Sequence, residues 1–216
     1  MPDEALKPAL RAALRMHEIG NENPYRLFFA AKGKSGASFG FMQGDLAAGQ
    51  PDVQKTFREV LAAAALQPDV IADIARRLSV HLIANPLSPA ETKQVNDALL
   101  AGRASVDTMD ETILAKIYVG VDTCIARAKQ AGRSIAPKAL LYVAMWINMT
   151  GPPSKLLVWL DGRDPQLRSP VASSGSLVDV PAVESYLLAT DYYTENPRNF
   201  AHMQESAAAG ASKLPA

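Results

Sequence analysis

The segment from Ala139 to Ile147 constrains the fold of this chain most strongly, because its side chains are apolar nearly all round. A helix with no polar face to present to water is typical of the buried centre of a domain. Gly151, Pro152 and Pro153 follow the segment and end the helix. The sequence therefore predicts a helical protein with this segment in its core.

Helix signals also occur along most of the rest of the chain. Ser88-Pro89-Ala90-Glu91 is a capping box with proline at the first helical position, and Gly132 stands where a helix would close. The expected helices cover roughly residues 4–19, 51–65, 68–80, 89–101, 109–131, 137–149, 153–161, 181–191 and 197–208.

Residues 21–45 differ, because Pro24 and several glycines interrupt any helical pattern. Leu27 to Ala31 is an apolar run short enough for a strand. The predicted fold class is mainly α, with a small β or irregular wing near residues 25–45. We expect a single domain over residues 1–206, with a long surface loop near 163–178, and a flexible Ala/Gly/Ser-rich tail over 207–216.

Composition argues against several classes of function. Lys plus Arg and Asp plus Glu are 22 each, so the chain lacks the basic surplus typical of nucleic-acid binding. Cys124 is the only cysteine and lies in a helical pattern, which indicates a core residue. His17, His81 and His202 are scattered without zinc-binding spacing. We therefore expect no nucleic-acid partner, no metal and no cofactor.

No apolar run is long enough to span a membrane. The acidic start, Met1 to Ala5, lacks the basic-then-apolar pattern of a signal peptide. The expectation is a cytoplasmic protein, or a secreted, periplasmic or phage-delivered one if a leader has been removed. The sequence makes no prediction about oligomeric state.

Glu18 is the main candidate for chemistry. It falls in the last turn of the first expected helix, just before Gly20, where the helix dipole disfavours a negative charge. A glycine-rich segment, Ser35 to Gln43, follows it, and a second carboxylate, Asp45, comes directly afterwards. Cleavage of a glycosidic bond needs a proton donor at the leaving oxygen, and a carboxylate or an activated water to complete the reaction. This arrangement favours a glycan-cleaving site.

Side chains suited to sugar surround these carboxylates in the sequence. Ser35, Ser38 and Gln43 offer hydroxyl and amide groups for sugar hydroxyls and acetamides. Tyr25 and Phe39, together with the neighbouring phenylalanine at position 41, supply apolar faces for sugar rings. The glycines would let the backbone approach a ligand closely.

Gly36-Ala37-Ser38-Phe39-Gly40-Phe41-Met42-Gln43 resembles the Gly-Ala-x-Gly-Leu-Met-Gln motif of lytic transglycosylases and goose-type lysozymes. It is also similar to the Ser-Gly-x-Ser-Phe-Gly-x-x-Gln-x-Asp segment of phage endolysins and bacterial lysozyme-like hydrolases. The resemblance covers residues 14–46 and implies a lysozyme-like fold that acts on peptidoglycan, at linkages between N-acetylmuramic acid and N-acetylglucosamine. It implies that Glu18 is the catalytic acid and that Ser38, Gly40, Met42 and Gln43 form the wall of the substrate cleft.

Several assignments stay open at this point. Ile19 follows Glu18 where lytic transglycosylases usually have serine, and the gap to Gly36 is longer than theirs, so Glu22 is an alternative acid. Asp45 is an N-cap for the segment that follows it, a catalytic base or water holder, or both, since the two roles are not exclusive. Asn148, near the end of the central helix, is a further candidate for the cleft.

The sequence therefore supports more than one function. The first is a peptidoglycan-cleaving enzyme that uses general acid catalysis, either as a hydrolase or as a lytic transglycosylase. The alternatives are a glycan-binding or partner-binding module on a lysozyme-like fold without turnover, and a hydrolase of the chitosanase or chitinase kind. The expected partner is an amino-sugar polysaccharide.

Overall fold

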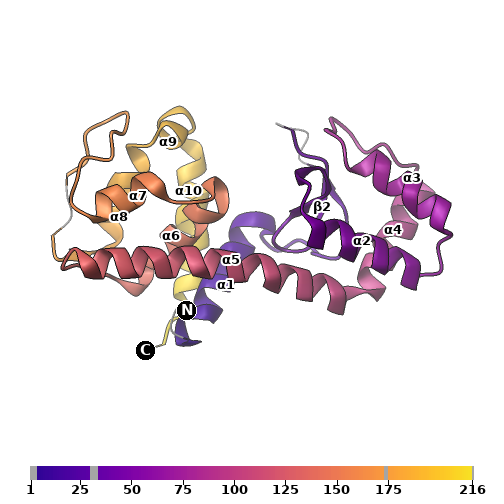
Figure 1. Cartoon of the computed structure of the whole chain (residues 1–216), viewed down its shortest axis with the longest axis horizontal. Helices are drawn as coiled ribbons and strands as arrows, with labels where there is room; N and C mark the ends of the chain where they lie inside the picture. Colours follow the sequence, from indigo (N-terminus) through magenta and orange to yellow (C-terminus); the bar gives the residue numbers. More distant parts are fainter. Residues whose placement is uncertain (1–3, 30–33, 173–174, 216) are drawn as a thin grey trace. The chain divides into compact units, whose positions relative to one another are not determined.

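The computed structural model describes residues 4–29, 34–172 and 175–215 and is mainly helical (Figure 1). This confirms the predicted fold class, including the small β wing. The chain divides into two compact units where the sequence predicts one domain. We call residues 18–113 the middle unit, and residues 1–17 with 114–216 the terminal unit.

The terminal unit is built around α6 (Pro137–Thr150). Every residue from Ala139 to Ile147 is buried, as the apolar run predicts. Helices α8 (Val180–Leu188) and α10 (Arg198–Ala211) pack against it. The other elements of this unit are η1 (Glu4–Leu6), α1 (Lys7–Ile19) up to His17, α5 (Arg103–Gln130) from Leu114, β4 (Ser134–Ile135), α7 (Ser154–Leu160), β5 (Leu177–Val178) and α9 (Asp191–Glu195).

The middle unit combines a small antiparallel sheet with helices. Within the described residues the strand order is β1 (Phe28–Phe29), β2 (Ala37–Phe39), β3 (Gly44–Asp45), with Ser38 paired to both Phe28 and Asp45. The sheet is followed by η2 (Leu46–Ala48), α2 (Pro51–Ala63), α3 (Pro68–Leu78) and α4 (Pro89–Ala101).

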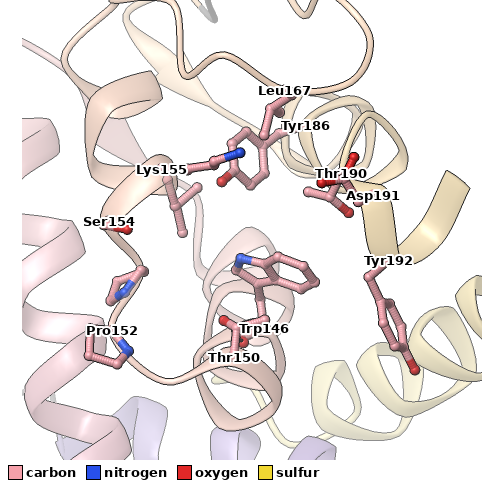
Figure 2. Close-up of a pocket in the computed structure, with 12 residues that line it drawn as sticks. Trp146, Thr150, Pro152, Ser154, Lys155, Leu167, Tyr186, Thr190, Asp191 and Tyr192 are labelled. Atoms are coloured by element: carbon pink, nitrogen blue, oxygen red, sulfur yellow. Dashed lines mark hydrogen bonds between the residues drawn. The ribbon is translucent and has the colours of Figure 1, made fainter.

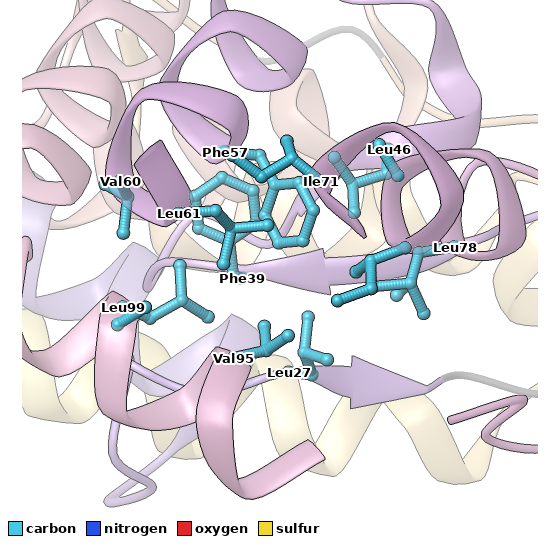
Figure 3. Packing of buried hydrophobic residues seen from close by; sticks show 14 of the residues in the cluster. Leu27, Phe39, Leu46, Phe57, Val60, Leu61, Ile71, Leu78, Val95 and Leu99 are labelled. Carbon is cyan, nitrogen blue, oxygen red and sulfur yellow. The ribbon is translucent and has the colours of Figure 1, made fainter. Parts of the chain in front are cut away.

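The core of the middle unit joins the sheet to these helices. Phe39 of β2 and Phe57 of α2 lie side by side, with ring centroids 5.6 Å apart, among leucines and valines from α2, α3 and α4 (Figure 3). Burial of these side chains supplies the main stabilisation of the wing, because a sheet with strands this short is marginal by itself.

Most predicted helices are confirmed within a few residues, and the capping box at Ser88 is present with both of its hydrogen bonds. The helix predicted over 181–191 is two helices, because α8 ends at Leu188 and Thr190 is the N-cap of α9. The prediction of a flexible tail from residue 207 is wrong for its first part. Helix α10 continues to Ala211, and Ala207 and Gly210 are buried.

Gly210 explains why a sequence rich in small residues is ordered there. A Cβ built at this position would lie 2.7 Å from the carbonyl oxygen of Ala9 and 2.8 Å from the Cβ of Ala13. The small residues of α10 therefore permit close packing on α1, and a small-residue composition indicates a helix contact here instead of a linker.

We expect Gly210→Ala to lower the free energy of unfolding by about 1–3 kcal/mol, because backbone atoms occupy the space that the methyl group needs. The sign opposes helix propensity, which by itself favours alanine over glycine. Denaturant unfolding measures the change. Gly175→Ala is the control, since nothing lies within 4 Å of a Cβ at Gly175. Equal stability of Gly210→Ala and the parent protein would contradict the packing argument.

Candidate active site

Glu18 lies in the last turn of α1, which ends at Ile19 as predicted. Gly20 adopts a left-handed conformation with φ +57°, which glycine reaches without strain, and the amide of Glu22 donates to the carbonyl oxygen of Ile19 at 3.0 Å. Glu18 is half-buried. The expected position of a carboxylate at a helix C-terminus is therefore confirmed.

A tight turn joins β2 to β3 and contains the end of the glycine-rich segment. Gly40 has φ +79°, Gln43 has φ +52°, and the amide of Gln43 donates to the carbonyl oxygen of Gly40 at 3.2 Å. A left-handed conformation is strained for glutamine, so the surrounding contacts must hold the turn in place.

Asp110, in the part of α5 that belongs to the middle unit, provides such contacts. Its carboxylate accepts hydrogen bonds from the amides of Phe41 at 2.9 Å and Met42 at 3.1 Å, and the side chain is fully buried. A Cβ at Gly40 would lie 2.5 Å from Asp110 Oδ1. The position therefore requires glycine because of this carboxylate as well as its φ. A role of Gly40 in the substrate cleft stays a prediction.

The side chain of Gln43 connects the turn to the end of α1. Ser38 Oγ donates to Gln43 Oε1 at 2.8 Å, and Gln43 Nε2 donates to the carbonyl oxygen of Glu18 at 3.4 Å. Two motif residues and the candidate acid, far apart in sequence, are thus joined in one hydrogen-bonded chain.

Asp45 is an N-cap. Its Oδ1 accepts from the amide of Ala47 at 2.8 Å at the start of η2, and from the amide of Gly36 at 3.0 Å. The capping interpretation is confirmed. A role as base or water holder stays a prediction.

The structure separates the remaining candidates by burial. Phe39 is fully buried, and Phe41 and Met42 are 1% and 5% exposed, so none of the three side chains faces water. Phe39, which was expected to offer an apolar face to a sugar ring, lies in the core cluster instead, and Met42, which was expected in the wall of the cleft, is also buried. Gly40 is buried with them.

Other candidates remain at the surface. Tyr25 is half-buried and its hydroxyl donates to Asp107 Oδ1 at 3.0 Å, while its ring packs on the core. Ser35 is half-buried and its carbonyl oxygen accepts from the amide of Leu82 at 3.1 Å. Asn148 is half-buried in α6 and belongs to the terminal unit, whereas the other candidates belong to the middle unit.

The alternative acid, Glu22, is exposed and forms an ion pair with Arg26, with 2.9 Å between Glu22 Oε2 and Arg26 Nη2. A catalytic proton donor is usually sheltered from water. The half-buried position of Glu18 suits that role better than the exposed position of Glu22.

Sequence reasoning missed Asp110 and Asp107, which hold the turn and Tyr25. The signal for Asp110 was weak but present. It is a charged residue on the same helical face as Val106, Met109 and Leu114, which are all buried. A carboxylate on such a face must have buried partners, but the sequence does not tell which backbone amides they are.

No protein-family model, curated protein or solved structure matches this chain. Within the described residues, no group of three or more His, Cys, Asp or Glu side chains is arranged to hold a metal ion. Likewise, none of the helices in the described part of the chain is both long enough and apolar enough to cross a membrane.

We expect Asp110→Ala to lower the free energy of unfolding by about 3 kcal/mol, because it leaves the amides of Phe41 and Met42 buried without their acceptor. Urea denaturation measures the change. Asp97→Ala is the matched control, since Asp97 forms an exposed ion pair with Lys93 and its removal should change stability by less than about 1 kcal/mol. Equal losses in both variants would show that Asp110 does not anchor the turn.

His17 precedes Glu18 and stacks on His202 in the terminal unit. The ring centroids are 5.1 Å apart, and His202 Nε2 donates to the carbonyl oxygen of His17 at 2.8 Å. His17 Nδ1 is buried without a hydrogen-bond partner among the described residues. Burial, reinforced by the nearby His202, lowers the pKa of His17 from 6.5 to about 4. The neutral form of His17 is therefore the one that the fold accommodates.

This lowered pKa predicts a pH dependence of stability. Between pH 6.5 and about 4 the unfolded chain binds a proton at His17 and the folded protein does not, so stability falls as the pH falls through this window. The His17→Gln variant should lose less of its free energy of unfolding than the parent protein over the same range. His81→Gln removes an exposed histidine and should keep the parent's slope. Parallel curves for the parent and His17→Gln would refute the assignment.

Proposed function

We propose that this protein is a lysozyme-like enzyme that cleaves peptidoglycan, with Glu18 as the general acid. The hydrogen-bonded chain from Ser38 through Gln43 to the carbonyl oxygen of Glu18 is the observation that supports this best. It connects the segment that resembles lytic transglycosylases and lysozymes to the backbone of the residue that would supply the proton.

The local structure suits a positioned proton donor. Glu18 is on a helix that stops directly after it, and its carbonyl oxygen is held from the turn by Gln43. The buried carboxylate of Asp110 holds the β2–β3 turn in place. Catalytic groups gain from supports of this kind, because small errors in the position of an acid cost much of its effect. Glu18 is half-buried in the last turn of α1, where the negative end of the helix dipole lies.

In the proposed reaction, Glu18 gives its proton to the glycosidic oxygen as the bond from that oxygen to the sugar C1 breaks. Two completions are open. In one, a water activated by a second carboxylate attacks the sugar. In the other, the Glu18 carboxylate takes the proton of the sugar's own hydroxyl, which closes an anhydro ring and restores the acid.

The structure bears on this choice through Asp45, which already accepts from two backbone amides as the cap of η2. Because that carboxylate has a structural task, we favour the route that uses Glu18 alone, which is the transglycosylase route.

The test is clearing of purified cell walls by the parent protein and by Glu18→Gln. We expect the variant to lose at least about 100-fold in rate, the loss typical when a general acid is removed, with unchanged circular dichroism. Glu22→Gln is the matched control and should clear walls at the parent rate, because Glu22 is an exposed, ion-paired residue.

Mass spectrometry of the digested walls then separates the two routes, since anhydro ends mark transglycosylation and reducing ends mark hydrolysis. Equal clearing by the parent and Glu18→Gln would remove Glu18 from the mechanism. Binding of walls without any clearing by the parent protein would replace the enzyme with a glycan-binding module.

A further inference from the structure

The terminal unit contains a pocket of about 290 Å³ that no part of the proposed reaction uses (Figure 2). Four helices border it. Trp146 and Thr150 come from α6, Lys155 from α7, Tyr186 from α8, and Thr190 and Asp191 from the start of α9. In Figure 2 the indole of Trp146 and the side chains of Tyr186 and Lys155 converge on the middle of the pocket. A volume of this size lies at the lower end of the range for small-molecule sites, which suits a ligand of one ring.

Tyr186 gives the first indication of a ligand. Its side chain is fully buried, and its hydroxyl has no hydrogen-bond partner among the described residues. Burial raises the pKa of Tyr186, and the nearby indole of Trp146 acts in the opposite direction. Phenylalanine would fill the same space without an unpaired polar group. A buried hydroxyl without a partner costs free energy, so we expect it to form a hydrogen bond with a bound ligand.

The other polar groups that line the pocket indicate which hydrogen-bonding groups a ligand should carry. Thr150 Oγ1 donates to the carbonyl oxygen of Trp146 at 2.7 Å, and Thr190 Oγ1 donates to that of Leu187 at 2.6 Å. Both threonine protons are therefore used within the protein, and both oxygens keep lone pairs that can accept. The Tyr186 hydroxyl supplies a donor. The pocket thus suits a ligand with a carbonyl and an N–H or O–H close together.

The charged residues of the pocket lining narrow the class of ligand further. Lys155 and Asp191 are the charged residues among the described lining, so the two charges balance. The ammonium of Lys155 already donates to the carbonyl oxygen of Gln166 at 3.2 Å. Recognition of a phosphate or a free carboxylate usually relies on a surplus of cationic donors, which this lining does not have. A neutral ligand fits better, and the indole of Trp146 offers it an apolar face.

We propose that this pocket binds one neutral N-acetylated amino-sugar ring, with the acetamide directed at Tyr186 and the threonine oxygens. The acetamide carbonyl accepts from the tyrosine hydroxyl, its N–H donates to a threonine oxygen, and the apolar face of the sugar lies on Trp146. This site lies within the terminal unit and does not involve Glu18. The inference therefore stands apart from the proposed cleavage, and each can fail without the other.

The experiment titrates the whole chain, labelled with ¹⁵N at tryptophan, with N-acetylglucosamine. The chain has two tryptophans, so two indole N–H signals report, and Trp146→Phe assigns them. We expect the Trp146 signal to shift saturably and the Trp159 signal to stay nearly constant, because the Trp159 N–H is bonded to the carbonyl oxygen of Ala172 at 3.1 Å.

Tyr186→Phe tests the hydroxyl directly. We expect it to fold normally and to weaken binding about three- to tenfold, the value of one neutral hydrogen bond. Tyr118→Phe makes the same chemical change at a hydroxyl of the terminal unit outside the pocket and should leave the affinity unchanged.

Glucose and N-acetylglycinamide complete the test, since the first has the ring without the acetamide and the second has the acetamide without the ring. Both should bind much more weakly than N-acetylglucosamine. The proposal is overturned by the absence of a saturable Trp146 shift, by equal affinities of the parent and Tyr186→Phe, or by either probe binding as tightly as N-acetylglucosamine. Cell-wall clearing plays no part in any of these outcomes.

Discussion

The carboxylate of Asp110 holds the turn between β2 and β3, and the candidate active site depends on that turn. A buried charge is costly unless hydrogen bonds compensate it, and here two backbone amides do so. The same carboxylate occupies the space where Gly40 has no side chain. The Asp110 carboxylate therefore explains why position 40 is glycine and why the amides of Phe41 and Met42 point towards α5. It also holds the turn that contains the strained backbone of Gln43.

The consequence reaches Glu18 through Gln43. Because the turn is held in place, the side-chain amide of Gln43 can bridge Ser38 Oγ and the carbonyl oxygen of Glu18. The proposed acid is thus supported from its backbone by a residue of the motif, while the aromatic residues of that motif are used for the core. This division of roles separates Phe39, which stabilises the wing, from Gln43, which contacts the end of the helix.

The terminal unit is stabilised mainly by apolar burial, unlike the hydrogen-bonded turn of the middle unit. Helix α6 is apolar on all sides and is covered by α8 and α10, so its stability comes from burial. Polar groups line the pocket where α6 ends and α7 begins, together with Tyr186 near the end of α8 and Thr190 at the start of α9. The hydroxyl of Tyr186 has no hydrogen-bond partner among the described residues. Buried polar groups without partners are rare in folded proteins, so the hydroxyl of Tyr186 favours a ligand site at this position.

The amino-acid sequence was enough to predict most of the helices, the buried position of Ala139–Ile147, the wing between residues 25 and 45, and the place of Glu18 at a helix end. These follow from local periodicity, caps and glycines, which act over a few residues. The tertiary structure decided which motif residues face inwards, that Asp45 is a cap, that α10 extends to Ala211, and that Asp110 holds the turn. Those features depend on contacts between segments many residues apart, such as Asp110 with Phe41 or Gly210 with Ala9, and a local pattern carries no information about which distant backbone atom will fill a given space.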